Sequence, residues 1–225
     1  MKAYIKHIMM LMLAAIALPA MAQKDKFFNP VTTSVTSQSI APDARSAGMG
    51  DVGAATDPDV VSQYWNPAKY PFNISRAGVA LNYTPWLRQL INDIDLAYVS
   101  GYYRIGDYSA VSASLRYFSL GEVQMSDDEH LTINPYEMSF DVAYSLMLSE
   151  HFSLGAAVRW IYSDLTYDFT SDTAPGSAFA ADLSCYYQNY LNIGERECQL
   201  GLGLNISNSG SRVTANISPW APALR

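Results

Sequence analysis

Five charged residues alternate with apolar side chains along the chain. They are Arg116, Glu137, Asp141, Arg159 and Asp182. Alternation with a period of two predicts strands whose side chains point to opposite faces, so these five are expected to share one interior face. Guanidinium and carboxylate groups on such a face could line a polar pathway or contact a substrate. We favour mutual ion pairing, because charges enclosed inside a protein commonly pair.

Other residue types that carry catalysis or bind metals do not form recognisable motifs. The histidines His7, His130 and His151 do not form a ligand cluster, whereas a metal site needs three or four converging ligands. The acidic stretch Asp127–His130 lacks the spacing of a calcium loop and is interpreted as a solvated loop. Neither Gly-x-Ser-x-Gly nor His-Glu-x-x-His occurs. We therefore expect no enzyme activity, no metal site and no cofactor.

The composition excludes several classes of protein. The 225 residues are 49% apolar and only 16% charged, with a net charge of -7. A nucleic-acid-binding protein would need a basic face, and a disordered chain would have few aromatic residues, whereas this one has 16 Tyr, 8 Phe and 4 Trp. The remaining classes are an unusual soluble β protein and a membrane β-barrel.

The beginning of the chain predicts export. Lys2 and Lys6 precede the short apolar stretch Ile8–Leu18, and Pro19 and a small-residue exit ending at Ala22 follow it. These features are typical of a cleaved secretory signal peptide over residues 1–22. A membrane anchor helix is the alternative, but the stretch is short for a span and Pro19 interrupts it.

Seven segments after residue 76 have the period of a strand. In Tyr136–Leu146, for example, one row of side chains is aromatic or aliphatic and the other is small, polar or charged. No lysine follows Lys69, although soluble sheets normally expose lysine on their polar face. An apolar row outside and a polar row inside are typical of membrane barrels. The segments are Ala77–Thr84, Asp93–Arg104, Ala110–Tyr117, Tyr136–Leu146, Phe152–Ser163, Phe179–Tyr187 and Gln199–Ser207.

The connections between these segments alternate in length. Ile105–Tyr108 and Ser149–His151 are short, whereas Gly121–Pro135 and Leu165–Ser177 are long. Outer-membrane barrels have short turns on the periplasmic side and long loops outside. The connection Leu191–Glu197 is somewhat long for this rule.

The predicted sheet is unfinished. Single-chain bacterial barrels usually have an even number of strands, and an open sheet edge cannot face lipid because its backbone groups would be unpaired. Residues 208–225 are predicted to form a loop or a truncated tail. We therefore expect residues 76–207 to be part of a larger barrel, or the sequence to come from an incomplete gene model.

Two cysteines follow on neighbouring predicted strands. Cys185 and Cys198 share the outward row and lie on either side of one connection. Export permits a disulfide, but the strand register that would bring the two together is not fixed by the sequence. Two separate lipid-facing thiols are the simpler alternative.

Residues 23–75 differ from the rest of the chain, because small residues dominate and alternation is absent. Such a segment could pack inside a barrel, whose interior must be filled or used. An ordinary periplasmic tail is the alternative. The notable residues are Arg45, Met49, Gly50, Gly53, Asn66, Pro67 and Ala68.

This pattern resembles the N-terminal hatch of FadL-like outer-membrane proteins, which folds into a barrel of 14 strands. More narrowly, Tyr83–Leu87, Asp95–Tyr98, Gly101–Tyr103 and Leu115–Glu122 resemble the PorV family of the type IX secretion system of Bacteroidetes. The resemblance covers roughly residues 40–206. It implies an all-β, transmembrane antiparallel barrel in the outer membrane, of which about half the strands are present.

The resemblance also implies a function and partners. Proteins of this family bind the C-terminal sorting domains of secreted cargo emerging from the translocon and pass the cargo to the attachment complex. The long loops would make these contacts, including residues 86–92. The alternatives are a FadL-like transporter of hydrophobic molecules, which the polar inner row disfavours, and a lipopolysaccharide deacylase, for which no Ser–His pair is evident.

Overall fold

In the computed structural model the described residues are 35–86, 93–124, 132–164, 175–194, 196–210 and 214–215. The chain divides into Met1–Thr33 and Ser34–Arg225, and all described residues belong to the second unit. The predicted signal peptide, His130 and most of the three predicted long loops lie outside the described residues.

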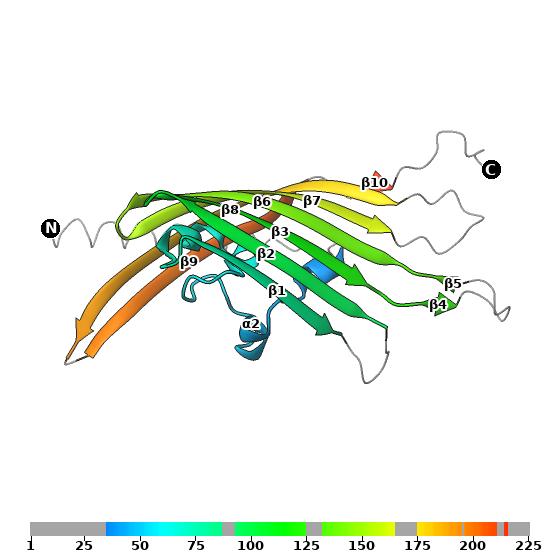
Figure 1. Ribbon diagram of the computed structural model, residues 1–225, viewed down its shortest axis with the longest axis horizontal. Coiled ribbons are helices and arrows are strands. Elements are labelled where there is room, and N and C mark those ends of the chain that lie inside the picture. Colours follow the sequence, from blue (N-terminus) through cyan, green and yellow to red (C-terminus); the bar gives the residue numbers. More distant parts are fainter. Residues whose placement is uncertain are drawn as a thin grey trace, which may run out of the picture. The chain divides into compact units, whose positions relative to one another are not determined.

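The second unit is built on one antiparallel sheet of long strands, each paired with its neighbours in the chain. Its strands curl into a half-barrel (Figure 1). All seven predicted strands are present, which confirms the all-β fold class. Most are long enough for a tilted transmembrane strand of about 9–11 residues. The bounds are β1 (Ala77–Pro85), β2 (Asp95–Ile105), β3 (Ser109–Ser119), β6 (Tyr136–Ser149), β7 (Phe152–Asp164), β8 (Gly176–Ile193) and β9 (Arg196–Gly210).

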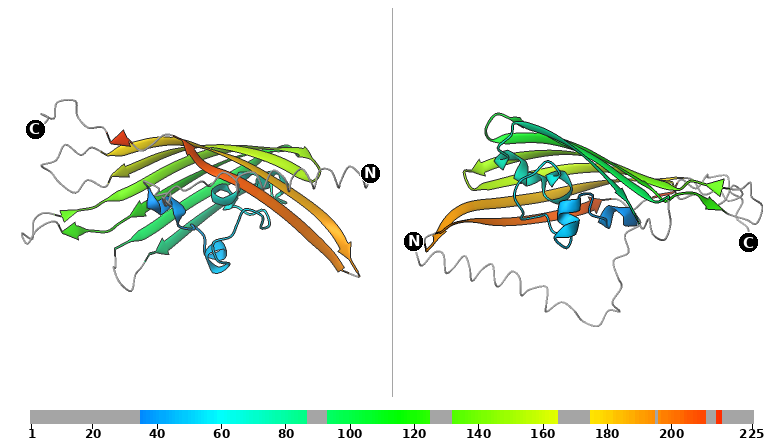
Figure 2. Two further views of the ribbon diagram at one scale, coloured as in Figure 1. Left: turned by 180° about the vertical axis from the view of Figure 1, so that it is seen from behind. Right: turned by 60° about the horizontal axis from the view of Figure 1, so that its bottom comes forward.

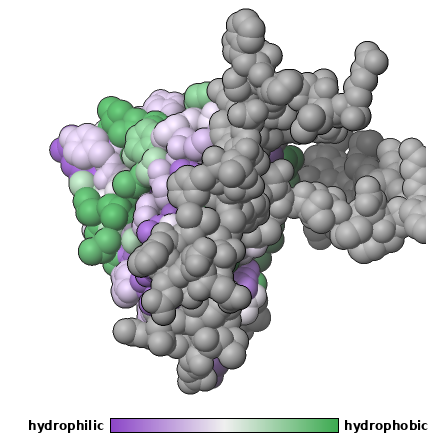
Figure 3. All heavy atoms as spheres, turned by 90° about the vertical axis from the view of Figure 1, so that its right-hand side faces the viewer, coloured by the Kyte–Doolittle hydropathy of each residue, from purple (hydrophilic) through white to green (hydrophobic). Residues whose placement is uncertain are grey.

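The two faces of the sheet have opposite polarity. Along β6, Tyr144 is 50% exposed on the outer face, whereas Ser145 is fully buried and Asp141 is 4% exposed on the inner face. The same alternation runs through β3 and β7. On the part of the described surface that Figure 3 leaves uncovered, hydrophobic residues form patches between polar ones. This arrangement suits a sheet with lipid outside and an enclosed polar interior.

No helix among the described residues is long and apolar enough to cross a bilayer.

Aromatic rings line one end of the outer face. Tyr117 and Tyr136 have centroids 5.7 Å apart, Tyr136 and Tyr162 are 5.9 Å apart, and Trp160 and Tyr162 are 6.0 Å apart. The row crosses β3, β6 and β7 at the end that carries the longer connections. Amphipathic rings prefer the boundary between lipid and water, so this row marks one edge of the apolar band.

The short turns lie at the other end of the sheet. Gly106, in the turn between β2 and β3, has a φ of 73°, a conformation that glycine adopts without steric cost. The expectation of a long Leu191–Glu197 connection is wrong, because Ile193 pairs with Arg196 and the strands continue almost to the turn. Gly194, with a φ of 67°, allows this tight reversal.

Short strands lie at two further places, and only β10 joins the main sheet, because β4 and β5 form a sheet of their own. β4 (Val123–Gln124) pairs with β5 (Thr132–Ile133) in the connection between β3 and β6. β10 (Thr214–Ala215) pairs with β8 beyond the end of β9. Within residues 208–225, for which the sequence predicts a loop or a truncated tail, residues 208–210 belong to β9 and residues 214–215 form β10. The rest of that tail lies outside the described residues.

The two cysteines are free in this structure. Cys185 pairs in register with Leu204, and Cys198 with Leu191. The two cysteines are thus separated by six positions along β9, or about 20 Å at roughly 3.3 Å per residue. A disulfide requires Cα atoms within about 7 Å, so this register separates the two thiols.

Four short helical elements among the described residues precede the sheet and lie on its concave side (Figure 2). Among them, α3 packs against β3, and η3 meets β2, β3, β6, β7 and β8. Asp43 caps α2 by accepting from the Ser46 backbone N–H at 2.9 Å. The bounds are η2 (Thr36–Ser39), α2 (Ala44–Gly48), α3 (Ser62–Trp65) and η3 (Pro67–Phe72).

Candidate functional site

The polar inner face carries a cluster of paired charges. Arg159 on β7 lies directly opposite Asp141 on β6 in the strand register. Its Nε donates to Asp141, and its Nη2 donates to Asp182 Oδ2 at 3.0 Å. Asp141 also accepts from Ser114 Oγ at 2.9 Å. Three of the five predicted interior charges, Asp141, Arg159 and Asp182, therefore form one ion-paired cluster.

A β-bulge completes this cluster. The register between β8 and β9 shifts so that Ser207 and Asn208 lie opposite Asp182. Asn208 has a φ of 58°, and its backbone N–H donates to Asp182 Oδ1 at 2.7 Å. Its side-chain oxygen accepts from Arg159 Nη1. The role of Asn208 is not evident from the sequence, because a bulge that re-aims a side chain leaves little trace in an alternating pattern.

Within the described part of the chain, Arg116 binds backbone carbonyl groups and not a carboxylate. It is 1% exposed, and among the described residues no carboxylate pairs with it. Its Nη2 donates to the carbonyl oxygens of Ser37 and Ile40, the latter at 2.7 Å. The guanidinium lies 5.5 Å from the centroid of the Tyr64 ring. Arg116 thus holds the segment before the sheet, which is residues 35–76 of the described chain, through charge-assisted hydrogen bonds and a cation–π contact.

Glu137 stands apart from the cluster. It is buried on β6 and accepts from Ser163 Oγ at 3.4 Å. No basic side chain pairs with it within the described ranges, and its Oε2 has no partner there. The structure therefore does not give Glu137 the ion pair that the sequence favoured.

Asn66, Pro67 and Ala68 lie buried against the inner face. Asn66 Oδ1 caps η3 by accepting from the Ala68 N–H at 3.0 Å, and Pro67 occupies the first turn. Asn66 Nδ2 donates at 2.9 Å to the carbonyl oxygens of Ala54 and Cys185. One side chain thus links the segment to itself and to β8.

Glycines on the inner face make room for this segment. A Cβ at Gly155 would lie 2.9 Å from the Ala68 backbone nitrogen, and one at Gly201 would lie 2.7 Å from the Ala55 carbonyl oxygen. A Cβ at Gly203 would overlap the Ala54 carbonyl oxygen. The small side chains in the polar row of β7 and β9 therefore permit close backbone approach.

The first part of the predicted motif lies farther from the sheet. Arg45 and Met49 are exposed around α2, and Gly50 has a φ of 83°. Arg45 forms an ion pair with Asp59 at 3.3 Å. Gly53 is buried, and a Cβ there would overlap the Trp65 ring. The structure thus separates the seven motif residues into an exposed turn and a buried group.

Lys69 is a buried cation whose role is not evident from the sequence pattern. Its side chain is fully buried, and its Nζ donates to the Gly53 carbonyl oxygen at 2.7 Å and to Thr56 Oγ1 at 3.1 Å. Burial lowers the pKa of Lys69 to about 8, against a smaller opposing attraction to Asp59. In the sequence, Lys69 is distinguished by being the last lysine of the chain.

The stability contribution of Lys69 is expected to rise with pH. Between about pH 8 and 10.5 the folded protein loses a proton that the unfolded chain keeps, so the free energy of unfolding increases with pH in that window. Below about pH 8, Lys69 is charged in both the folded and the unfolded protein, so the full desolvation cost of burying the charge remains. Urea unfolding measures the free energy of unfolding of the wild type and of Lys69→Met. Between about pH 8 and 10.5, the difference between these two free energies should change by up to about 1.4 kcal/mol per pH unit. A constant difference would contradict this.

Within the described ranges, no group of three His, Cys, Asp or Glu side chains could hold a metal ion. His151, the one described histidine, lies in a turn with its Nδ1 3.0 Å from the Gln188 carbonyl oxygen. What the inner face offers is a framework of buried polar contacts that fixes a segment of the chain.

A curled antiparallel sheet with apolar outer rows and a polar inner face defines a class, the outer-membrane β-barrel proteins. The family model described as "Type IX secretion system protein PorV" matches residues 21–217. The chain therefore belongs to the PorV family and has a role in type IX secretion, which confirms the resemblance seen in the sequence. Family and fold both fit an outer-membrane protein. Among curated proteins, none matches the chain.

Proposed function

We propose that this chain binds the C-terminal signal domain of secreted cargo at the outer membrane and passes the cargo to the cell-surface attachment complex. Its membership of the PorV family, over residues 21–217, is the observation that carries this proposal. Partners of this kind would be cargo with C-terminal sorting domains and components of the translocon and attachment complex. The proposal includes export by a cleaved signal peptide over residues 1–22.

The polar inner face supports this role over transport of hydrophobic molecules. A channel for such molecules needs an apolar lining, whereas the described inner rows present buried Ser139, Asp141, Arg159 and Asp182. The segment before the sheet occupies the concave side and is held there by Arg116 and Asn66. We propose that residues 23–75 act as an internal hatch and that the five interior charges stabilise the interior.

The longer connections are the proposed contact surface for cargo. In an antiparallel sheet of successive strands, the connections after β1, β3 and β7 all leave at the same end. β4 and β5 form a separate two-stranded sheet within one of these connections. Loops on a rigid scaffold commonly carry binding.

A pull-down tests the proposed function. The full chain is tagged in its native host, the outer membrane is solubilised, and the co-purifying chains are identified. We expect exported cargo with C-terminal sorting domains. Bound fatty acid without cargo would instead favour a transporter of hydrophobic molecules and would contradict the proposal.

A loop replacement sharpens the same experiment. Replacement of residues 125–131 by a Gly/Ser sequence of equal length should reduce cargo recovery at least about tenfold, while the barrel still folds, because the change lies between β4 and β5. The control is Asp107→Asn with Tyr108→Ser, a change at the opposite end of the sheet. Equal cargo recovery by both variants would exclude this loop as the contact.

A further inference from the structure

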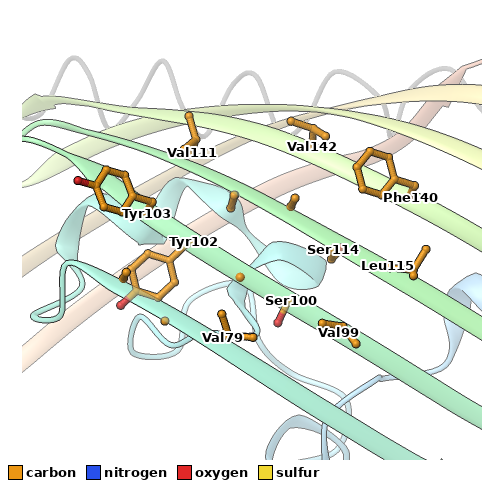
Figure 4. Close-up of a pocket in the computed structure, with 15 residues that line it drawn as sticks. Val79, Val99, Ser100, Tyr102, Tyr103, Val111, Ser114, Leu115, Phe140 and Val142 are labelled. Atoms are coloured by element: carbon orange, nitrogen blue, oxygen red, sulfur yellow. The ribbon is translucent and has the colours of Figure 1, made fainter.

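An apolar groove of about 630 Å³ crosses the outer face over β1, β2, β3 and β6. Its floor is formed by Gly101 and Ala113, which lie directly opposite one another in the register. Larger side chains stand on both sides of this floor (Figure 4). The walls include Val79, Val99, Tyr103, Val111, Phe140 and Val142.

The groove is continuous with the surface that faces lipid. Its wall residues belong to the outward rows, and Val79, Tyr103 and Phe140 are exposed. The groove extends along β2 from Val99 to Tyr103, or about 13 Å at roughly 3.3 Å per residue. A long, narrow, apolar depression on a lipid-facing surface matches an extended hydrocarbon chain in shape and polarity.

One end of the groove carries a cation. The Arg76 guanidinium lies 5.6 Å from the centroid of the Tyr103 ring, and Tyr103 lines the groove. Arg76 is exposed and immediately precedes β1, at the end of the sheet that carries the short turns. Aromatic and basic residues at this level meet lipid headgroups. An anionic phosphate there would complement the charge of Arg76.

We propose that this groove is a binding site for one acyl chain of a glycerophospholipid, with the lipid phosphate at Arg76. The proposal depends on the outer face being in lipid and does not depend on cargo binding. Gly101 is the critical position, because any side chain there would occupy the floor of the groove. A Cβ at Gly101 would lie 3.4 Å from the Gly78 carbonyl oxygen, an ordinary contact, so substitution there fills the groove without disturbing the strands.

Native mass spectrometry of the full chain in detergent tests the site. Dioleoylphosphatidylglycerol is the first probe, and dioleoylglycerol, which has the same chains and no phosphate, is the second. We expect Gly101→Leu and Ala113→Leu each to weaken binding of both lipids at least about tenfold. Ala156→Leu is the matched control, because Ala156 is an exposed residue in the outward row of β7.

The contact between Arg76 and the lipid phosphate is tested with a separate variant and a separate control. Arg76→Gln should weaken binding of phosphatidylglycerol at least about fivefold and leave dioleoylglycerol unchanged. Arg196→Gln, at the turn between β8 and β9, is the control cation at the same end of the sheet. Heat-modifiable migration on gels verifies that each variant is folded.

Two results would overturn the proposal. If Gly101→Leu and Ala113→Leu bind phosphatidylglycerol as tightly as Ala156→Leu does, the groove does not hold an acyl chain. If Arg76→Gln loses no more phosphatidylglycerol than Arg196→Gln, the phosphate does not lie at Arg76. Normal cargo recovery by the groove variants would leave the proposed secretion role intact, so failures of the two proposals are distinguishable.

Discussion

Replacement of Arg159 by methionine is expected to destabilise the folded protein by about 3–5 kcal/mol. The guanidinium forms ion pairs with Asp141 and Asp182 and donates to Asn208. Without it, two buried carboxylates face one another with no positive partner, and the penalty of desolvation is no longer offset. Urea unfolding of the protein in lipid vesicles, followed by tryptophan fluorescence, measures the loss.

A compensated variant distinguishes charge from packing. The triple change Arg159→Met, Asp141→Asn and Asp182→Asn removes the uncompensated charges while it keeps similar volumes. It should recover most of the stability that Arg159→Met loses, because buried charges can often be replaced together at small cost. If the triple variant is as unstable as the single one, the cluster contributes through packing and not through charge.

Replacement of Gly203 by alanine is expected to release the segment before the sheet, around Ala54 and Asn66, from its contact with β9. A Cβ at this position would overlap the Ala54 carbonyl oxygen and lie 3.0 Å from Asn66 Nδ2. The strand is held by its ladder to β8, so the segment must move and the hydrogen bonds of Asn66 to Ala54 and Cys185 are lost. Overpacking costs about 1–3 kcal/mol, and each buried group left without a partner adds about 1–3 kcal/mol.

Limited trypsin digestion measures this release. Lys69 is fully buried in the wild type, so cleavage after it should be slow, and Gly203→Ala should accelerate it at least about tenfold. The control is Gly48→Ala, because a Cβ at Gly48 meets no atom within 4 Å. Continued protection of Lys69 in Gly203→Ala would show that the segment tolerates the added methyl group.

The alternation of residues was sufficient to predict the sheet. In β6 and β7 the polar row and the apolar row were each assigned to the correct face, because a strand turns its side chains to opposite sides with a period of two. The short turns at Gly106 and His151 followed from the spacing between the strands. The turn at Gly194 was missed, because the alternation of polarity is interrupted before it, at Asn189 and Tyr190.

The partners of the interior charges were only partly predictable. The pairing of Asp141 with Arg159 follows from the strand register, which the sequence constrains through the hydrophobic pattern. Arg116 points to the same face, yet it binds carbonyl oxygens of Ser37 and Ile40. These groups precede it by more than seventy residues, and no local pattern predicts such a contact.

By itself, the sequence determined that this protein is a sheet with an apolar outside and a polar inside, and which charges face inward. Local period and turn spacing act over a few residues, so they can be read directly from the chain. The tertiary structure alone decided that Asn208 completes the Arg159 cluster, that Lys69 is buried, and that Gly203 admits the segment. Each depends on backbone positions brought together from distant parts of the chain, where a bulge or a missing Cβ sets the distance of approach.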